Sequence, residues 1–241
     1  MKKIGIFKYL IAVGCFLLMG GGVFMFGKWV KKKWIVHVTL TSPHWEQRLS
    51  EMNEIKRGKY KIIFLGNSLT ELFDLEYYFK DSSLLNCGIV GDFSEGLVKR
   101  AGSIGRLKPD KLFIEIGIND IIEQIPLNEI CANYEELIEI IKKESPDTKI
   151  FIQSNFPVII NRPSILTSDK NVNDLVKEQN ENLKDLAKRT HCTFIDIYPA
   201  FTERNVDFKA LFIWDGIHFT DKAYTIWASI VKPYLSAESA K

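Results

Sequence analysis

A serine and an aspartate–histidine pair supply the residue types that nucleophilic hydrolysis needs. Ser68 stands in the segment Gly66–Thr70 (GNSLT), directly after the apolar run Ile62–Leu65, and Asp215 and His218 lie three residues apart near the C-terminus. A histidine can take the proton of a serine hydroxyl, and a carboxylate can hold the imidazole in the tautomer that this step requires. The three residues therefore predict a serine hydrolase, with Ser68 as its nucleophile.

Two further segments offer hydrogen-bond donors for a developing oxyanion. Residues 86–92 (NCGIVGD) and 117–120 (GIND) each follow an apolar run that is typical of a buried strand. Gly88 or Gly91 can contribute a backbone N–H and Asn119 a side-chain amide, and such donors stabilise a tetrahedral intermediate without adding a titrating charge. Asp120 is expected to hold its own loop rather than to react.

These four segments, in this order, resemble the SGNH/GDSL hydrolase family over roughly residues 60–235. The resemblance implies that Ser68 is the nucleophile, His218 the base and Asp215 the acid that orients it. It also implies an oxyanion hole formed by the Ser68 N–H, the Gly91 N–H and the Asn119 amide. The family's common Gly-Asp-Ser reads Gly66-Asn67-Ser68 here, so the charge near the serine is less negative by one; activity is expected to survive, because asparagine keeps the size and turn-forming habit of aspartate.

Each of these assignments has a rival within the sequence. Ser68 could serve only as a helix N-cap, Gly88 competes with Gly91, and Asp196 competes with Asp215. Asn119 could be only a turn residue, and three other histidines compete with His218: His37, His44 and His191. The Gly-x-Ser-x-Gly elbow is absent, because Leu69 and Thr70 follow the serine, and this disfavours the α/β-hydrolase superfamily.

The family resemblance implies an esterase that removes short acyl groups, above all acetyl, from a carbohydrate or another small ester. Members described as platelet-activating-factor acetylhydrolase-like or lysophospholipase-like are also similar, so a lysophospholipase or thioesterase acting on lipid acyl chains is the alternative. A catalytically silent glycan-binding protein on the same fold is the alternative outside enzymes. The chain contains no His-Glu-x-x-His, paired Cys-x-x-Cys or Gly-x-x-x-x-Gly-Lys pattern, so neither a metal nor another cofactor is expected.

Apolar runs and helical stretches alternate along the chain, which predicts a three-layer, doubly wound α/β fold with a parallel sheet of the flavodoxin-like kind. The expected strands are Lys61–Leu65, Leu84–Ile89, Lys111–Ile116, Lys149–Ser154 and Cys192–Ile197. The expected helices cover residues 70–80, 94–107, 128–144, 171–189 and 220–234. Ligand sites in such sheets lie beyond the carboxyl ends of the strands, where the predicted site residues fall.

The N-terminal 33 residues differ in charge from the rest of the chain. They hold seven lysines and no acid, and removing them leaves 25 basic against 30 acidic residues, a net charge of −5 that argues against nucleic acid as a partner. Residues 9–27 carry no charge and would span about 28 Å as a helix, so we expect a single-pass membrane anchor, with a cleavable signal peptide as the alternative. The catalytic domain is expected outside the cytoplasmic membrane, in the periplasm or the extracellular space.

The sequence therefore predicts three regions. Residues 1–33 are the anchor or signal segment, 34–58 a linker with an amphipathic helix, and 59–236 the hydrolase domain. The helix is expected over Pro43–Lys56, with Ser42 as its N-cap, because Trp45, Leu49 and Met52 recur at helical spacing. Residues 34–40 could pair as a short strand.

Overall fold

The computed structural model describes residues 30–159, 171–203 and 206–236, and the chain divides into two compact units, Met1–Thr39 and Leu40–Lys241. Within the first unit residues 30–39 are helical, so the short strand considered for residues 34–40 does not form. None of the helices in the described ranges is long and apolar enough to cross a membrane. The predicted span over residues 9–27 lies outside those ranges.

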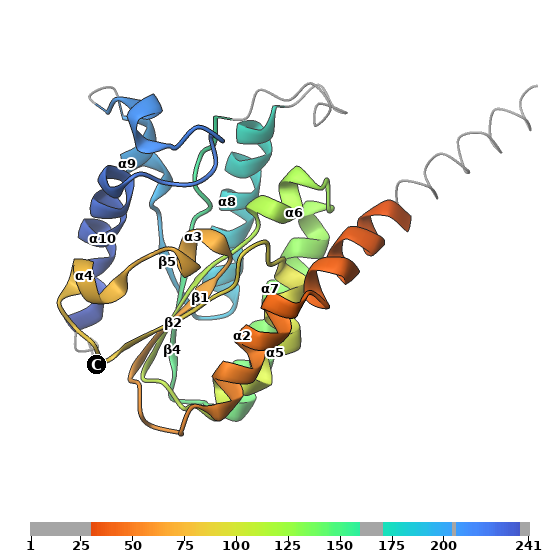
Figure 1. The fold of residues 1–241 in the computed structure, drawn as a ribbon, viewed down its shortest axis with the longest axis vertical. Helices are drawn as coiled ribbons and strands as arrows, with labels where there is room; N and C mark the ends of the chain where they lie inside the picture. The colour runs from red at the N-terminus through yellow and green to blue at the C-terminus, as the bar shows by residue number, and fades with distance from the viewer. Residues whose placement is uncertain (1–29, 160–170, 204–205, 237–241) are drawn as a thin grey trace, which may run out of the picture. The chain divides into compact units, whose positions relative to one another are not determined.

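The second unit is built on a five-stranded sheet whose strands all run parallel (Figure 1). The strands are β1 (Ile62–Gly66), β2 (Leu84–Gly88), β3 (Lys111–Glu115), β4 (Lys149–Gln153) and β5 (Thr193–Ile195). Their order, β2-β1-β3-β4-β5, is the flavodoxin-like order of a doubly wound fold, which confirms the predicted sheet. The chain passes from β1 to β2 on one side and then returns to β3 on the other side of β1. The switch point therefore lies between β1 and β3, and the crevice at their carboxyl ends is the expected place for a site.

Helices cover both faces of this sheet (Figure 1). One layer contains α5 (Ser94–Arg106), α7 (Leu127–Glu144) and α8 (Val172–Arg189), and α2 (Pro43–Glu54) packs against α5 on its outside. The other layer contains α4 (Leu75–Phe79) and α10 (Asp221–Ser236), with α9 (Tyr198–Thr202) and the 3₁₀ helix η2 (Phe208–Leu211) in contact with α10. The predicted helix α2 is confirmed with its cap, because Ser42 Oγ accepts the Trp45 N–H at 3.3 Å, and it belongs to the same compact unit as the sheet.

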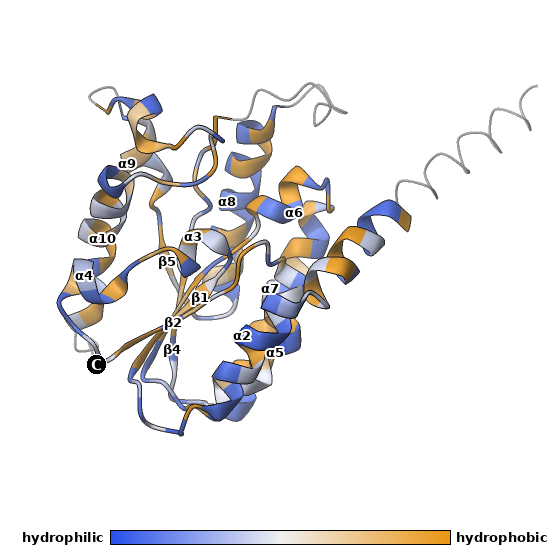
Figure 2. Ribbon diagram, viewed as in Figure 1, coloured by the Kyte–Doolittle hydropathy of each residue, from blue (hydrophilic) through white to orange (hydrophobic). Residues whose placement is uncertain are grey.

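Aromatic side chains fill the space between the sheet and α10. Phe64, Phe113 and Phe151 occupy neighbouring register positions on three strands, and their rings stack at centroid distances of 4.8 and 4.5 Å. Trp227 of α10 is fully buried in the same cluster, and its Nε1–H donates to Gln153 Oε1 at 2.7 Å. Figure 2 shows the hydrophobic strands between helices whose hydrophilic sides face away from the sheet, and this burial makes the sheet a rigid base for the loops at its edge.

The structure differs from the predicted elements in its short helices. The stretch over residues 70–80 is two helices, α3 (Ser68–Glu71) and α4, because Asp74 accepts the Tyr77 N–H and begins a new helix. Three short helices were not predicted: α6 (Ile118–Ile122), α9 and η2. Their four or five residues are too few to show a hydrophobic period.

Candidate active site

Ser68, His218 and Asp215 lie together at the carboxyl edge of the sheet. Ser68 is the first residue of α3, two residues beyond the end of β1, and its Oγ lies 2.8 Å from His218 Nε2. On the other side of the imidazole, His218 Nδ1 lies 2.6 Å from Asp215 Oδ2. The structure thus places a hydroxyl, an imidazole and a carboxylate in one hydrogen-bonded chain, although the serine and the histidine are 150 residues apart.

The Asp215 carboxylate is held by its own loop as well as by the histidine. Asp215 Oδ1 accepts the N–H groups of Ile217 and His218 at 2.9 Å each. Partial burial raises the pKa of the Asp215 carboxyl, but hydrogen bonds from His218 and from the two backbone amides outweigh it, so the pKa lies below its ordinary value. Asp215 is therefore ionised at neutral pH and can stabilise a positive charge on the imidazole.

The rival acid and the other histidines lie elsewhere. Asp196 is exposed just past β5, and His191 follows α8, at the end of the sheet opposite to the site. His44 lies on α2 and His37 in the first unit. The structure joins His218 both to a serine and to an acid.

Asn67 stabilises the turn that presents Ser68. Its Oδ1 accepts the Leu69 N–H at 2.8 Å, so the amide caps α3 as the carboxylate of the common Gly-Asp-Ser would. Asn67 is fully buried, where a neutral amide avoids the desolvation penalty of an ionised carboxylate. Gly66 permits the turn, because a Cβ there would lie 2.2 Å from Thr70 Oγ1. The departure at Asn67 thus leaves the local geometry in place.

The predicted oxyanion donors follow two neighbouring strands: Gly91 lies on the loop after β2, and Asn119 lies in the short helix α6 after β3. Gly91 has φ 77°, a left-handed conformation that favours glycine, and its N–H has no acceptor within the described ranges. The rival Gly88 N–H is occupied, because it donates to Asn86 Oδ1 at 2.9 Å. Asn119 donates one amide hydrogen to Asp92 O at 2.9 Å, and a primary amide carries a second hydrogen that can point to a substrate. The Ser68 N–H opens a helix and is likewise not used inside it.

Two buried acids, Asp92 and Asp120, form hydrogen bonds that hold the segments after β2 and β3 in place. Asp92 is fully buried and forms an ion pair with Arg100, at 2.9 Å from Nη2 and 3.0 Å from Nε, and it accepts the Trp45 indole N–H at 3.0 Å. Burial raises the pKa of Asp92 although Arg100 opposes the shift. Asp120 accepts the N–H and the hydroxyl of Ser94 at the start of α5, so it holds its loop as predicted, and burial raises its pKa to about 7.

A third buried acid, Glu115, ends β3. One oxygen accepts the Asn155 amide at 3.0 Å, while Oε2 has no partner in the described part of the chain. Burial raises the pKa of Glu115 to about 7. Glu115, Asn155 and the Asp92–Arg100 pair were not predicted from the sequence. The signal that could have indicated the pair is its spacing: Asp92 lies just before the predicted helix 94–107, and Arg100 lies eight residues further on, within that helix.

Comparison with known proteins assigns the chain to a family. Residues 64–226 match the GDSL-like lipase/acylhydrolase family, and this segment includes more than half of the chain and all five predicted site residues. The chain therefore belongs to the GDSL-like lipase/acylhydrolase family, and it is an ester-hydrolysing enzyme. No curated protein matches it.

Several solved structures share the fold. A Streptococcus pneumonia protein described as a platelet activating factor candidate is 24% identical, with a TM-score of 0.70 over 88% of this chain and 99% of that one. A GDSL-like lipase from Bacteroides thetaiotaomicron is 21% identical, with a TM-score of 0.67 over 79% and 96%. An acetylxylan esterase from Geobacillus stearothermophilus is 20% identical, with a TM-score of 0.60 over 78% and 100%.

Proposed function

We propose that the protein is a serine esterase that hydrolyses short-chain esters through Ser68, His218 and Asp215. The observation that carries the proposal is the continuous chain of hydrogen bonds from Ser68 Oγ through the imidazole to the Asp215 carboxylate, 2.8 and 2.6 Å long. Both distances lie within the reach that proton transfer and orientation require. The edge position of Ser68 leaves its hydroxyl next to the loops that hold Gly91 and Asn119.

The geometry supports a two-step acyl transfer. Ser68 Oγ attacks the ester carbonyl while His218 Nε2 takes its proton, and Asp215 stabilises the imidazolium that forms. The Ser68 N–H, the Gly91 N–H and the Asn119 amide stabilise the negative charge on the carbonyl oxygen. His218 then protonates the leaving alcohol, and a water molecule attacks the acyl-enzyme with the imidazole again acting as the base. No metal or other cofactor is needed for any of these steps.

The acetylxylan esterase of similar fold supports these assignments. Its catalytic mutants replace a serine, an aspartate and a histidine by alanine, and the aspartate and histidine are three positions apart. Asp215 and His218 have the same spacing in this chain.

We propose an acetyl group on a carbohydrate as the preferred substrate. Trp214 directly precedes Asp215, and 93% of its surface is exposed. An indole face beside the triad can pack on a sugar ring while its N–H stays in water, which favours a glycan over a long acyl chain. The similarity in fold to an acetylxylan esterase also supports an acetylated carbohydrate as substrate.

The experiment that tests this function is a panel of p-nitrophenyl esters of increasing acyl length, together with acetylated oligosaccharides. Wild type should hydrolyse acetyl esters fastest, and Ser68→Ala should lose at least about 10³-fold in kcat with its fold unchanged. A preference for long acyl chains would favour the lysophospholipase or thioesterase alternative. Full activity of Ser68→Ala would contradict the mechanism.

We also propose that residues 1–33 anchor the enzyme in the cytoplasmic membrane, with the catalytic domain outside it. The uncharged run over residues 9–27 supports the anchor, and the short basic leader that precedes it favours a cytoplasmic N-terminus with the domain outside. The protein should then stay in the membrane fraction after a high-salt wash, because hydrophobic insertion does not depend on ionic strength. A C-terminal alkaline phosphatase fusion should be active, and an inactive but well-expressed fusion would contradict the outside placement.

A further inference from the structure

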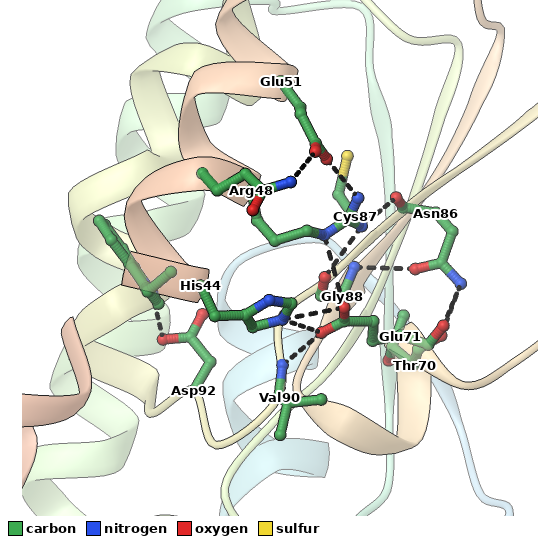
Figure 3. A network of polar contacts seen from close by, with 12 residues as sticks. His44, Arg48, Glu51, Thr70, Glu71, Asn86, Cys87, Gly88, Val90 and Asp92 are labelled. Carbon is green, nitrogen blue, oxygen red and sulfur yellow. Dashed lines mark hydrogen bonds and ion pairs between the residues drawn. The ribbon is translucent and has the colours of Figure 1, made fainter. Parts of the chain in front are cut away.

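Glu71, the last residue of α3, reaches from the helix of Ser68 to the loop of Gly91 (Figure 3). Glu71 Oε2 accepts the N–H of Val90 at 2.5 Å, and Val90 is the residue directly before Gly91. A charge-assisted hydrogen bond of this kind is stronger than one between neutral groups. One side chain thus connects the element that carries the nucleophile to the backbone that carries a second oxyanion donor.

Helix α2 holds the Glu71 carboxylate from the other side. Figure 3 shows His44 and Arg48 facing it: His44 Nε2 lies 3.0 and 3.1 Å from its two oxygens, and Arg48 Nε lies 3.6 Å from Oε1. Arg48 also donates through Nη2 to the carbonyl oxygens of Asn86 and Gly88, at 3.2 Å each. The same guanidinium therefore contacts the end of β2 and the carboxylate that binds the next loop.

The end of β2 and helix α3 are packed in direct contact. A Cβ on Gly88 would lie 2.1 Å from the Glu71 backbone nitrogen, so only glycine fits there. Asn86 Nδ2 donates to the carbonyl oxygens of Thr70 and Phe73, at 2.6 and 3.0 Å. With these contacts α3 cannot shift along β2 without breaking several hydrogen bonds, so a side chain on α3 is a fixed reference for the loop beyond β2.

Gly91 lies between two anchors. Val90 is held by Glu71 on one side, and Asp92 is held on the other by Arg100, Trp45 and Asn119. Gly91 itself is the conformationally free residue between them, with φ 77°. The Asp92 N–H also donates to Ile89 O at 3.1 Å and closes a turn over Val90 and Gly91, so the direction of the Gly91 N–H depends on how Val90 is held within that turn.

From this arrangement we infer that Glu71 is a positioning residue for ester hydrolysis, which sets the Gly91 N–H relative to Ser68, and that His44 and Arg48 orient it. The inference rests on the proposed function. Losing an oxyanion donor outright costs about 10²–10³ in kcat, and a displaced donor should cost less. For Glu71→Ala we therefore expect kcat to fall about 10- to 100-fold while KM changes less than about threefold, because this contact strengthens in the transition state.

The experiment compares Glu71→Ala and Glu71→Gln with a matched control, Glu51→Gln. Glutamine keeps a carbonyl oxygen that can accept the Val90 N–H, so Glu71→Gln should recover most of the rate, to within about fivefold of wild type. Glu51 accepts Arg48 Nη1 at 2.9 Å from the solvent side and does not contact the loop, so its variant should behave as wild type. Titrating active sites to completion with a fluorophosphonate gives kcat per intact site, which partial misfolding would not change.

A second readout does not need catalysis: hydrogen exchange of the Val90 amide followed by NMR. Exchange should be at least about tenfold faster in Glu71→Ala than in wild type and nearly unchanged in Glu71→Gln and Glu51→Gln. Wild-type kcat per titrated site in Glu71→Ala, or unchanged Val90 exchange, would overturn the inference. Wild-type hydrolysis that does not depend on Ser68 would instead contradict the proposed function, and with it any role of Glu71 in catalysis.

Discussion

Asp215 and Glu115 are both carboxylates that contact one polar side chain, but they lie in opposite environments. Asp215 is on a surface loop. Partial burial raises the pKa of its carboxyl, but hydrogen bonds from His218 and two backbone amides together outweigh burial and hold the pKa below its ordinary value. Glu115 is fully buried at the end of β3, and within the described ranges only one of its oxygens has a hydrogen-bond partner; burial raises its pKa to about 7. The comparison shows that the depth of burial, set against the hydrogen bonds that the carboxylate accepts, decides which acid remains ionised.

The acids at this edge of the sheet have two different tasks, which match the difference in their pKa values. An acid that must orient a base and stabilise an imidazolium needs a permanent negative charge, and the Asp215 loop supplies it through backbone donors. The buried acids Asp92, Glu115 and Asp120 instead hold side chains and loops behind the site. Substitutions in the first region should therefore change the rate, and substitutions among the buried acids should mainly change stability.

The largest effect should come from the exposed acid. Asp215→Asn keeps the size of the side chain, but the asparagine NH₂ can donate a hydrogen bond to His218 Nδ1 and so favour the wrong imidazole tautomer. We expect kcat to fall by about 10²–10⁴ with little change in thermal stability. Steady-state kinetics and thermal melting measure both quantities. The control is Asp196→Asn, the exposed rival acid past β5, which should keep wild-type activity. If Asp196→Asn lost activity and Asp215→Asn kept it, the assignment of the acid would be reversed.

Asn119 joins the two regions, because its amide donates to Asp92 O and we propose that its second hydrogen binds the oxyanion. Asn119→Ala should lower kcat by about 10²–10³ with KM nearly constant. Because the hydrogen bond to Asp92 O is lost, the free energy of unfolding should also fall by about 1 kcal/mol. Asn128→Ala, an exposed asparagine in the first turn of α7, is the control. A change in KM alone would assign Asn119 to ground-state binding.

The smallest effect on rate should come from Glu115→Gln, which instead changes the pH dependence of stability. The pKa of Glu115 is raised from 4.5 to about 7 in the folded protein. Between these values the folded protein keeps a proton that the unfolded chain has released, so the free energy of unfolding falls as pH rises and the loss is complete above about pH 7. Glutamine should remove a penalty of roughly 3 kcal/mol at pH 8 and almost none at pH 4.

Urea unfolding of wild type and Glu115→Gln at pH 4, 6 and 8 measures this difference. Exposed Glu76 provides the control variant, Glu76→Gln, for which no such difference is expected. If wild type and Glu115→Gln were equally stable at pH 8, the raised pKa of Glu115 would be contradicted.

The sheet and the main site residues could be predicted from the sequence because each depends on local patterns. Apolar runs marked all five strands to within two residues, and the carboxyl-end rule for parallel sheets placed Ser68, Gly91 and Asn119 at one edge. The resemblance to a known family then placed Asp215 and His218 beside them, and the structure brings the triad within hydrogen-bonding distance.

The supporting contacts could not be predicted in the same way. Arg48 and Glu71 are charged residues on two separate helices, where such residues ordinarily face solvent. The tertiary fold brings Arg48 Nε to 3.6 Å from Glu71 Oε1 across α2 and α3. Glu115 ends an apolar strand, where nothing in the sequence distinguishes a buried acid from an exposed one. Short helices such as α6 and α9 contain about one turn, so they carry no period to detect.

The most direct test of the account is to identify the residue that a fluorophosphonate modifies in the native enzyme. Peptide mass spectrometry should find one adduct, on Ser68, appearing in parallel with the loss of esterase activity; Ser68→Ala should take up none. Labelling should be much slower in Asp215→Asn, because the histidine base is then misoriented. An adduct on another serine, or complete inactivation without any adduct on Ser68, would contradict the assignment of Ser68 as the nucleophile.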